Sequence, residues 1–209
     1  MIYKKQDFCK LIDVSPQIFT KLETYHALLL KWQKAINLVS PKTIGQAWHR
    51  HFIDSAQIIK LIPSGTKIYA DLGCGGGFPG LVIAIMQPDL DVHLVESDER
   101  KCQFMRTVAR EVGANNITIH TKRIEAVSDD FCPDFITARA LSSLENLCQY
   151  CLPWAQKNKD LELCFMKGAR AEDELEQAKS RFNFDYKSTP SITDKDAKLL
   201  SISNLTIMI

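Results

Sequence analysis

The spacing of apolar residues divides the chain near residue 64. Before that point, apolar residues recur every three or four positions, as they do from Ile18 to Ile36, and this spacing is typical of amphipathic helices. Pro63-Ser64-Gly65 then marks a junction, after which short apolar runs alternate with helical stretches. We therefore predict an N-terminal helical region over residues 1–64 and an α/β domain over residues 65–209.

The N-terminal region is predicted to be helical throughout. Ser15 suits an N-cap and Pro16 suits the first helical position, while Ser40-Pro41 separates two longer helices. The expected helices cover residues 4–12, 16–39 and 43–62.

The remaining chain predicts a sheet with helical crossovers. Alternation of strands and helices gives a parallel sheet with right-handed connections, and two final strands without a helix between them give an antiparallel hairpin. The expected strands are 68–72, 91–96, 117–120, 134–138, 160–166, 182–187 and 199–208, and the expected helices are 79–86, 98–112, 123–128, 143–157 and 171–181. The fold class is therefore α/β, with seven strands.

Composition narrows the class of protein. Hydrophobic residues make up 45% and charged residues 24% of 209, which is ordinary for a globular protein, and no apolar run approaches the roughly 20 residues of a membrane span. The N-terminus lacks a signal-peptide core, so we expect a cytoplasmic protein without membrane attachment, and we expect it to be a monomer. Seven irregularly spaced cysteines indicate reduced thiols, and the Cys148/Cys151 pair lacks further ligands, so we expect no metal.

Charge is distributed unevenly along the chain. The net charge is +1, but the first 67 residues hold ten basic and four acidic side chains, which leaves +6 there and −5 in the remainder. A basic N-terminal region is compatible with a surface that faces RNA. A solvated helix surface predicts the same numbers of charged side chains equally well.

Residues 67–80, KIYADLGCGGGFPG, predict a strand, a glycine-rich loop and a helix start. Gly75 to Gly80 fits the dinucleotide-binding pattern G-x-G-x-x-G. In dinucleotide-binding proteins, however, the first glycine of the pattern lies at the end of the strand, whereas here the strand already ends at Asp71. The phase Asp71, Gly73, Gly75, Gly77 instead resembles motif I of S-adenosylmethionine-dependent methyltransferases, in which the acid orients the loop. Glu96 ends the next strand and can accept both hydroxyls of an adenosine ribose, which would serve NAD as well.

Four segments resemble one family closely: WQKAINL (32–38), RHFIDS (50–55), DLGCGGGFPG (71–80) and ARA (138–140). The family is ribosomal RNA small subunit methyltransferase G, formerly glucose-inhibited division protein B. The resemblance implies the seven-stranded Rossmann-like sheet of class I methyltransferases, with an S-adenosylmethionine-binding domain over residues 65–209. It also implies methylation of guanine N7 in a loop of 16S ribosomal RNA, with the RNA or the 30S subunit as partner.

The resemblance also implies contacts to the cofactor. It places them at Gly73, Phe78, Ile124, Glu125 and Arg139, beside Asp71, Gly75 and Glu96 from the residue pattern. Arg139 can approach either the methionine carboxylate or the target base, and the sequence leaves both open. The family usually has Gly-Arg-Ala-Glu where this chain has KRIE at 122–125, so the adenine-side contacts depart from the family pattern.

Guanine N7 carries a free lone pair, so methyl transfer there leaves no proton to abstract, and we predict no general base.

Candidate contacts to RNA phosphates are Arg50, Arg100, Lys101, Arg123 and Lys167, although an ordinary salt bridge is as good an explanation for each. His51 and Asp54 are expected to hold the N-terminal region to the body. Two alternatives stay open at this point: an NAD-dependent oxidoreductase, and a non-catalytic RNA-binding ribosome-assembly factor.

Overall fold

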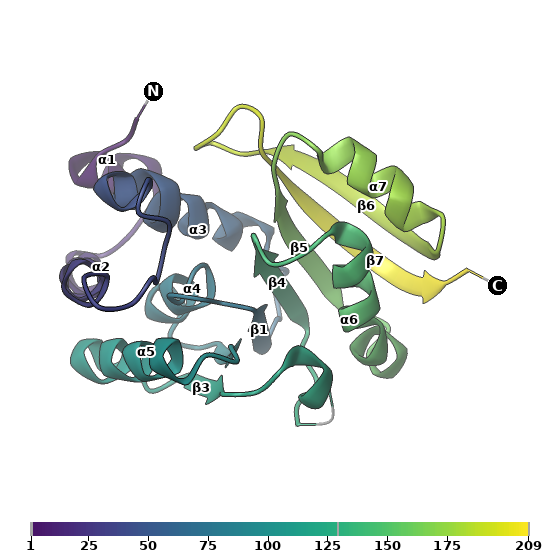
Figure 1. The fold of residues 1–209 in the computed structure, drawn as a ribbon, viewed down its shortest axis with the longest axis horizontal. Coiled ribbons are helices and arrows are strands. Elements are labelled where there is room, and N and C mark those ends of the chain that lie inside the picture. Colours follow the sequence, from purple (N-terminus) through teal and green to yellow (C-terminus); the bar gives the residue numbers. More distant parts are fainter. Residues whose placement is uncertain (1, 129, 209) are drawn as a thin grey trace.

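A computed structural model describes residues 2–128 and 130–208. Within these ranges the chain forms a seven-stranded sheet of order β3-β2-β1-β4-β5-β7-β6 (Figure 1). Neighbours among the first five strands run parallel, and β7 runs antiparallel to both β5 and β6. The strands are β1 (Ile68–Leu72), β2 (Asp91–Val95), β3 (Ile117–His120), β4 (Phe135–Arg139), β5 (Glu162–Lys167), β6 (Phe182–Pro190) and β7 (Lys198–Ile207). The predicted α/β fold class, with its terminal hairpin, is confirmed.

Helices cover both faces of the sheet. Figure 1 shows α1, α2, α4 and α5 on one side and α6 and α7 on the other. The longer helices are α1 (Lys5–Leu11), α2 (Pro16–Trp32), α4 (Gly80–Met86), α5 (Glu99–Val112), α6 (Leu144–Lys157) and α7 (Ala171–Lys179), and a short 3-10 turn, η4, spans Ile124–Ala126. No helix among the described residues is long and apolar enough to cross a membrane.

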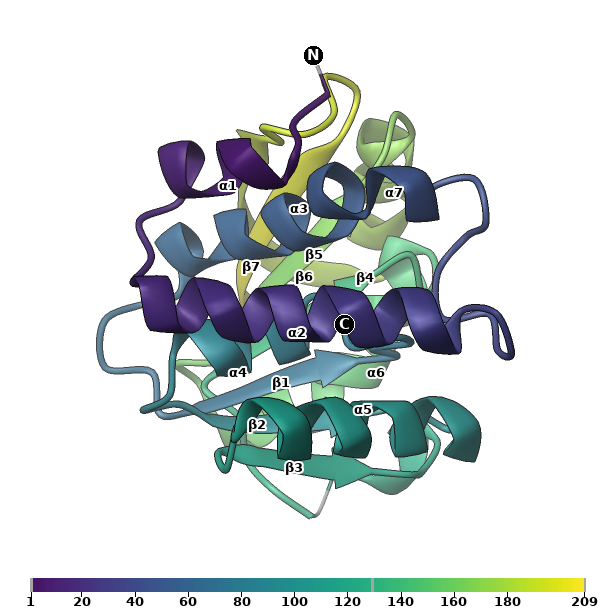
Figure 2. The same ribbon diagram turned by 90° about the vertical axis from the view of Figure 1, so that its left-hand side faces the viewer.

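Alternate residues of the central strands enter separate hydrophobic cores on the two faces. Tyr69 of β1 packs with α2, α4 and α5, whereas Ala70 and Leu72 pack with α6 and α7. The N-terminal helices share the first of these cores with α4 and α5, and Figure 2 shows α2 lying across the front of that layer. The N-terminal region is thus packed as an outer layer on one face of the sheet.

The second predicted helix ends earlier than expected. It stops at Trp32 instead of Val39 because the Gln33 side chain bonds to the backbone that follows. Gln33 Nε2 donates to the Val39 carbonyl oxygen at 2.8 Å, and Gln33 Oε1 accepts from the N–H groups of Leu38 and Val39 at 3.0 and 3.1 Å. These bonds satisfy the backbone polar groups without a helix, so residues 33–40 form a turn.

The predicted helix over residues 43–62 is wrong as a single regular element. It consists of four short segments: η1 (Ile44–Gln46), η2 (Trp48–Ile53), α3 (Asp54–Ala56) and η3 (Gln57–Leu61), of which η2 has π-helical bonding. The carbonyl oxygen of Arg50 accepts a hydrogen bond from Arg139 at 2.9 Å, so a distant side chain enters the hydrogen bonding of this turn. Irregular helical turns of this kind are frequent at functional sites. The other predicted elements agree with the structure to within a few residues.

Candidate active site

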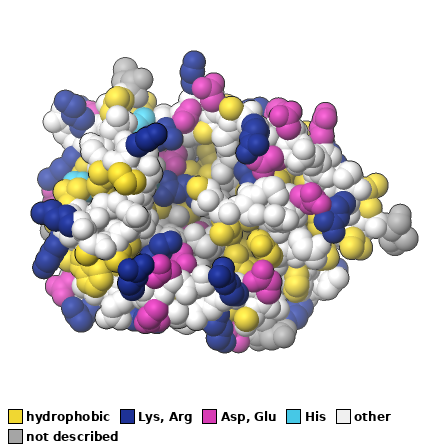
Figure 3. All heavy atoms as spheres, in the orientation of Figure 1, with side chains coloured by type: hydrophobic (Ala, Val, Ile, Leu, Met, Phe, Trp, Pro, Cys, Tyr) yellow, Lys and Arg dark blue, Asp and Glu magenta, His cyan; other side chains and the backbone are white. Residues whose placement is uncertain are grey.

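A cavity of about 880 Å³ lies at the carboxyl ends of β1, β2, β4 and β5, between the sheet and the N-terminal region. This is where open α/β sheets bind their ligands. Its wall includes the glycine-rich loop, η2, the segment after β4 and the loop between β6 and β7. Figure 3 shows acidic and basic side chains interspersed around a recess near the centre of this face, without a large patch of one sign.

The glycine-rich loop is attached to the sheet through Asp71. The Asp71 side chain is fully buried, and its Oδ2 accepts from the Gly80 N–H at 2.7 Å while its Oδ1 accepts from the Thr137 hydroxyl at 3.2 Å. A Cβ at Gly80 would lie 2.7 Å from the Asp71 Cβ, so only glycine fits at this close approach. Asp71 is not among the residues that line the cavity, and its contacts hold the first turn of α4 against β1.

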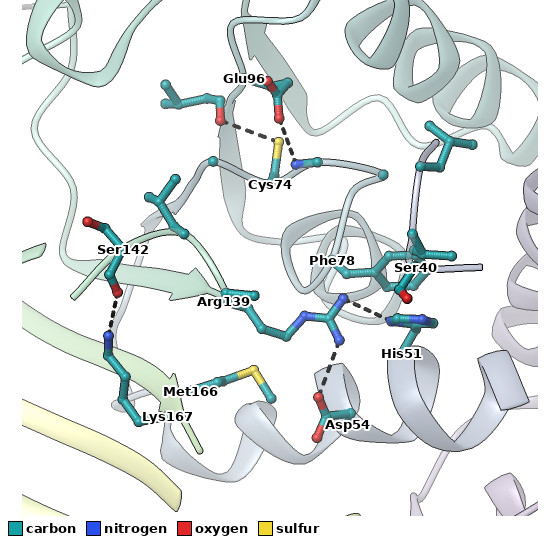
Figure 4. A pocket seen from close by; sticks show the side chains of 18 of the residues that line it. Ser40, His51, Asp54, Cys74, Phe78, Glu96, Arg139, Ser142, Met166 and Lys167 are labelled. Atoms are coloured by element: carbon teal, nitrogen blue, oxygen red, sulfur yellow. Dashed lines mark hydrogen bonds and ion pairs between the residues drawn. The ribbon is translucent and has the colours of Figure 1, made fainter. Parts of the chain in front are cut away.

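Glu96, at the end of β2, closes the other side of the loop. Its Oε2 accepts from the Gly75 N–H at 3.0 Å and its Oε1 from the Asp98 N–H at 2.9 Å, while the Lys101 ammonium lies 3.8 Å from Oε2. A carboxylate offers about four acceptor sites, so two N–H bonds leave capacity for further donors. In Figure 4, Glu96 and Arg139 lie apart, with Cys74 of the glycine-rich loop between them.

The structure brings the predicted cofactor residues together, apart from Asp71 beneath the loop. Gly73, Gly75, Phe78, Glu96, Ile124, Glu125 and Arg139 all line the cavity. Gly73 has φ +63°, and a Cβ there would meet the Leu141 side chain at 2.4 Å. The loop therefore offers backbone groups where a larger residue would fill the space.

Arg139, at the end of β4, is held by the N-terminal region. Its Nη1 donates to the Arg50 carbonyl oxygen at 2.9 Å. Nη1 also donates to Asp54 Oδ2 at 3.3 Å, and Nη2 donates to His51 Nδ1 at 3.0 Å (Figure 4). The guanidinium also lies 5.4 Å from the centre of the Phe78 ring. Arginine has five N–H donors, so these three bonds leave two for a ligand.

His51 accepts from Arg139 because it is neutral. Burial, with help from the nearby Arg139 and Arg50 charges, lowers the pKa of His51 to about 3. The proton of the neutral ring then sits on Nε2, which is 2.9 Å from the Thr43 hydroxyl. His51 and Asp54 therefore do join the N-terminal region to the body, and both also line the cavity.

The predicted RNA-contact residues differ in what surrounds them. Four of them, Arg50, Lys101, Arg123 and Lys167, line the cavity, whereas Arg100 does not. The Arg100 side chain is 74% exposed and lies 3.8 Å from Asp98 Oδ1.

The four predicted RNA-contact residues that line the cavity differ in how they are paired. Arg50 pairs with Asp194 at 2.9 Å, and Lys167 is buried, with Nζ 2.8 Å from Glu174 Oε2. Lys101 lies near Glu96, as described above, while Arg123 has no carboxylate partner among residues 2–128 and 130–208. Lys167 is therefore engaged inside the fold, and Arg123 is, of these four cations, the most available to a phosphate.

One wall of the cavity had not been predicted: the loop joining β6 to β7, residues 191–197. The Thr193 hydroxyl donates to Asp54 Oδ1, the Ile192 N–H donates to Gln57 Oε1 at 3.0 Å, and Gln57 Nε2 donates to the Ser191 hydroxyl at 3.1 Å. These partners lie more than 130 residues apart in sequence. No local sequence signal connects them.

Comparison with known proteins decides the family. The family model for "rRNA small subunit methyltransferase G" matches residues 18–203. The chain belongs to this family. A relative named ribosomal RNA small subunit methyltransferase G from Parvibaculum lavamentivorans is 43% identical over 209 aligned residues, covering 98% of this chain and 91% of the relative. One of the same name from Allorhizobium ampelinum is 42% identical, covering 92% of each chain. The resemblance seen in the sequence is confirmed.

Solved structures with low sequence identity share the fold. A putative O-methyltransferase from Klebsiella pneumoniae aligns with a TM-score of 0.57 at 15% identity and covers 96% of both chains. A glycopeptide N-methyltransferase complexed with S-adenosylmethionine aligns with a TM-score of 0.59 at 10% identity, covering 73% of this chain and 94% of that one. The fold is that of class I methyltransferases. The NAD-dependent oxidoreductase and the non-catalytic assembly factor are not favoured.

Proposed function

We propose that this protein transfers a methyl group from S-adenosylmethionine to N7 of a guanosine in small-subunit ribosomal RNA. The observation that carries the proposal is one cavity lined by both an acidic residue, Glu96, and a cationic residue, Arg139, in a chain of the methyltransferase G family. The relatives' names support the substrate class.

The residues present fit S-adenosylmethionine, which supplies the methyl group as a sulfonium. Glu96 has acceptor capacity left for two ribose hydroxyls. We place the amino-acid part of the cofactor beside Gly73 and its adenine beside Ile124 and Glu125, because all three residues line the cavity. The two remaining donors of Arg139 can bind the methionine carboxylate or the target base.

No proton-transfer residue is needed at N7, because its lone pair accepts the methyl group directly. The protein's own part is to hold the reacting atoms in line and to exclude water, and such positioning can contribute roughly 7–11 kcal/mol in favourable cases. The N7 edge of a guanine in an A-form duplex faces a groove that side chains cannot enter. We therefore infer that the target guanosine lies in a loop or leaves its stack.

Contacts to the RNA backbone are proposed at the rim of the cavity. Arg123 is the strongest candidate because it lines the cavity without a carboxylate partner in the described ranges. Replacing Arg123 by Gln should weaken RNA binding. It should also make the slope of log affinity against log salt concentration less steep, by the equivalent of about one released counterion. Replacing Arg100 by Gln is the matched control, because that side chain does not line the cavity. Equal effects of the two changes would contradict this assignment.

Calorimetry tests the cofactor directly. The protein should bind S-adenosylhomocysteine with one site per chain, and Glu96→Gln should weaken binding about tenfold, because two N–H groups and the ribose then compete for one amide oxygen. Glu99→Gln, an exposed change on the next helix, is the control. Binding of NADH without binding of S-adenosylhomocysteine would refute the proposal. The monomeric state, the cytoplasmic location and a mechanism without metal stay predictions.

A further inference from the structure

Helix α2 of the N-terminal region reaches the glycine-rich loop through one side chain. Tyr25 is fully buried, and its hydroxyl donates to the Gly76 carbonyl oxygen at 2.5 Å. The two residues are 51 positions apart in sequence. A helix outside the nucleotide-binding α/β unit therefore bonds to the backbone of the cofactor loop.

This hydrogen bond fixes the peptide between Gly76 and Gly77. The Gly77 N–H bonds to the Cys74 carbonyl oxygen at 2.8 Å, so one end of the peptide closes the turn and the other end faces Tyr25. Gly77 has φ +92°, and a Cβ there would lie 2.9 Å from the Tyr25 hydroxyl. The loop and the tyrosine are thus fitted closely to each other. A buried carbonyl group that loses its donor is costly, so the loop has a strong preference for this arrangement while Tyr25 is present.

A second N-terminal segment supports the same part of the loop. The turn held by Gln33 brings the Leu38 carbonyl oxygen to 3.1 Å from the position of a Cβ at Gly76. Leu38 also lines the cavity. The loop is therefore supported on its outer side by the N-terminal region and on its inner side by Asp71 and Glu96.

The Tyr25 ring continues this contact toward Arg139. It stacks on Phe78, with ring centres 5.1 Å apart and planes 16° apart, and the Arg139 guanidinium lies 5.4 Å from the centre of the same Phe78 ring. Phe78 therefore contacts both Tyr25 and the Arg139 guanidinium. A change in the tyrosine contact would reach both the loop and Arg139.

We propose that Tyr25 is a positioning residue for the cofactor: its hydroxyl holds the Gly76 peptide, so that the loop presents its backbone to S-adenosylmethionine in a binding-competent form. The role rests on the proposed function, because it concerns the same site. It assigns to the N-terminal helical region a share in cofactor binding in addition to any contact with RNA.

The test is Tyr25→Phe, which removes only the hydroxyl and keeps the ring stack. We expect the dissociation constant for S-adenosylhomocysteine and the KM for S-adenosylmethionine to rise about tenfold, while kcat at saturating cofactor changes less than threefold. Amide hydrogen exchange over residues 73–80 should be faster than in the wild type without any ligand, with residues 117–120 unchanged.

The matched control is Thr66→Val, which also removes one hydroxyl and keeps the side chain's shape. The Thr66 hydroxyl is partly buried and donates to the Pro63 carbonyl oxygen at 2.9 Å, at the opposite end of β1 from the glycine-rich loop. Its loss should lower the melting temperature slightly and leave cofactor affinity unchanged. Wild-type cofactor affinity and loop exchange in Tyr25→Phe would overturn the assignment, as would an equal loss of affinity in Thr66→Val. A wild-type protein that does not bind S-adenosylhomocysteine would instead refute the proposed function, and the hydrogen-exchange result would still report on the loop.

Discussion

The Asp54 carboxylate lies 3.3 Å from Nη1 of Arg139 and joins two segments that are 85 residues apart in sequence. The other oxygen of Asp54 accepts the Thr193 hydroxyl, so one side chain connects the N-terminal region, β4 and the loop between β6 and β7. The Arg139 and Asp54 side chains are only 17% and 16% exposed, which limits screening of their charges by solvent. The orientation of Arg139 in the cavity therefore depends on Asp54.

Replacing Asp54 by Asn should reduce both the rate of methyl transfer and the stability of the protein. The amide keeps one oxygen acceptor but loses the negative charge beside Arg139, so we expect the free energy of unfolding to fall by about 1–3 kcal/mol. Displacement of Arg139 should lower the rate of methylation by roughly 10- to 100-fold. Single-turnover kinetics and urea unfolding measure the two effects separately.

Asp89→Asn is the control for that change, because Asp89 is an exposed carboxylate in the turn before β2, at the opposite end of the sheet from the cavity. It should leave both quantities unchanged. An Asp54→Asn enzyme with the wild-type rate would show that Arg139 does not need this partner.

Gly73→Asp should abolish cofactor binding in a protein that remains folded. The new carboxylate would enter the space beside the loop, where we place the amino-acid part of the cofactor, and the Leu141 side chain that it meets is 36% exposed and can move. Gly113→Asp is a closely matched control, because Gly113 has φ +62° against +63° at Gly73 and nothing lies within 4 Å of its Cβ position. Calorimetry should find normal cofactor affinity in the Gly113 variant only. Normal affinity in Gly73→Asp would remove the cofactor from this part of the loop.

Gly80→Ala should destabilise the attachment of α4 to β1. The added methyl group would lie 2.4 Å from Leu94 Cδ2 and 2.7 Å from Asp71 Cβ, and overpacking of this kind costs about 1–3 kcal/mol. Gly45→Ala adds the same group where nothing lies within 4 Å, so its unfolding free energy should be unchanged or slightly higher. Equal stability of the two variants in urea unfolding would show that the backbone gives way at Gly80 without cost.

The sequence predicts best what depends on neighbouring residues. The strand before Asp71, the glycine-rich loop and Glu96 could be assigned because a strand end and a glycine pattern are local signals. The end of α2 and the irregular η2 turn could not, because they depend on the Gln33 side-chain bonds and on a bond from Arg139 to a carbonyl 89 residues away. The wall formed by residues 191–197 rests on contacts of still longer range.

The buried Asp71 carboxyl should make stability depend on pH. Burial raises the pKa of Asp71 to about 7, against about 3.9 in an unfolded chain, so the folded state binds the proton more tightly. The stability contributed by Asp71 is therefore fully present below pH 4 and is lost as the pH rises toward 7, by about 1.4 kcal/mol for each unit of pKa difference. His51, with its pKa lowered to about 3, acts in the opposite direction, because its contribution is lost as the pH falls below 6.5.

Asp71→Asn separates these two effects. The amide can still accept from the Gly80 N–H and can donate to the Thr137 hydroxyl, and His51 is unchanged, so its contribution cancels in the comparison with the wild type. The unfolding free energy of the variant relative to the wild type should increase steadily from pH 4 to about pH 7 and level off at higher pH. A difference that does not vary with pH would show that Asp71 is ionised throughout this range.

The central claim is methyl transfer to guanine N7 in small-subunit ribosomal RNA. The most direct measurement incubates the protein with labelled S-adenosylmethionine and naked RNA, isolated small subunits or whole ribosomes, followed by nucleoside analysis. We predict that label appears in 7-methylguanosine from small-subunit RNA in at least one of these substrates, and that Arg139→Ala strongly reduces it. Label in a different nucleoside, or none in any of the three substrates with protein that binds the cofactor, would contradict the claim.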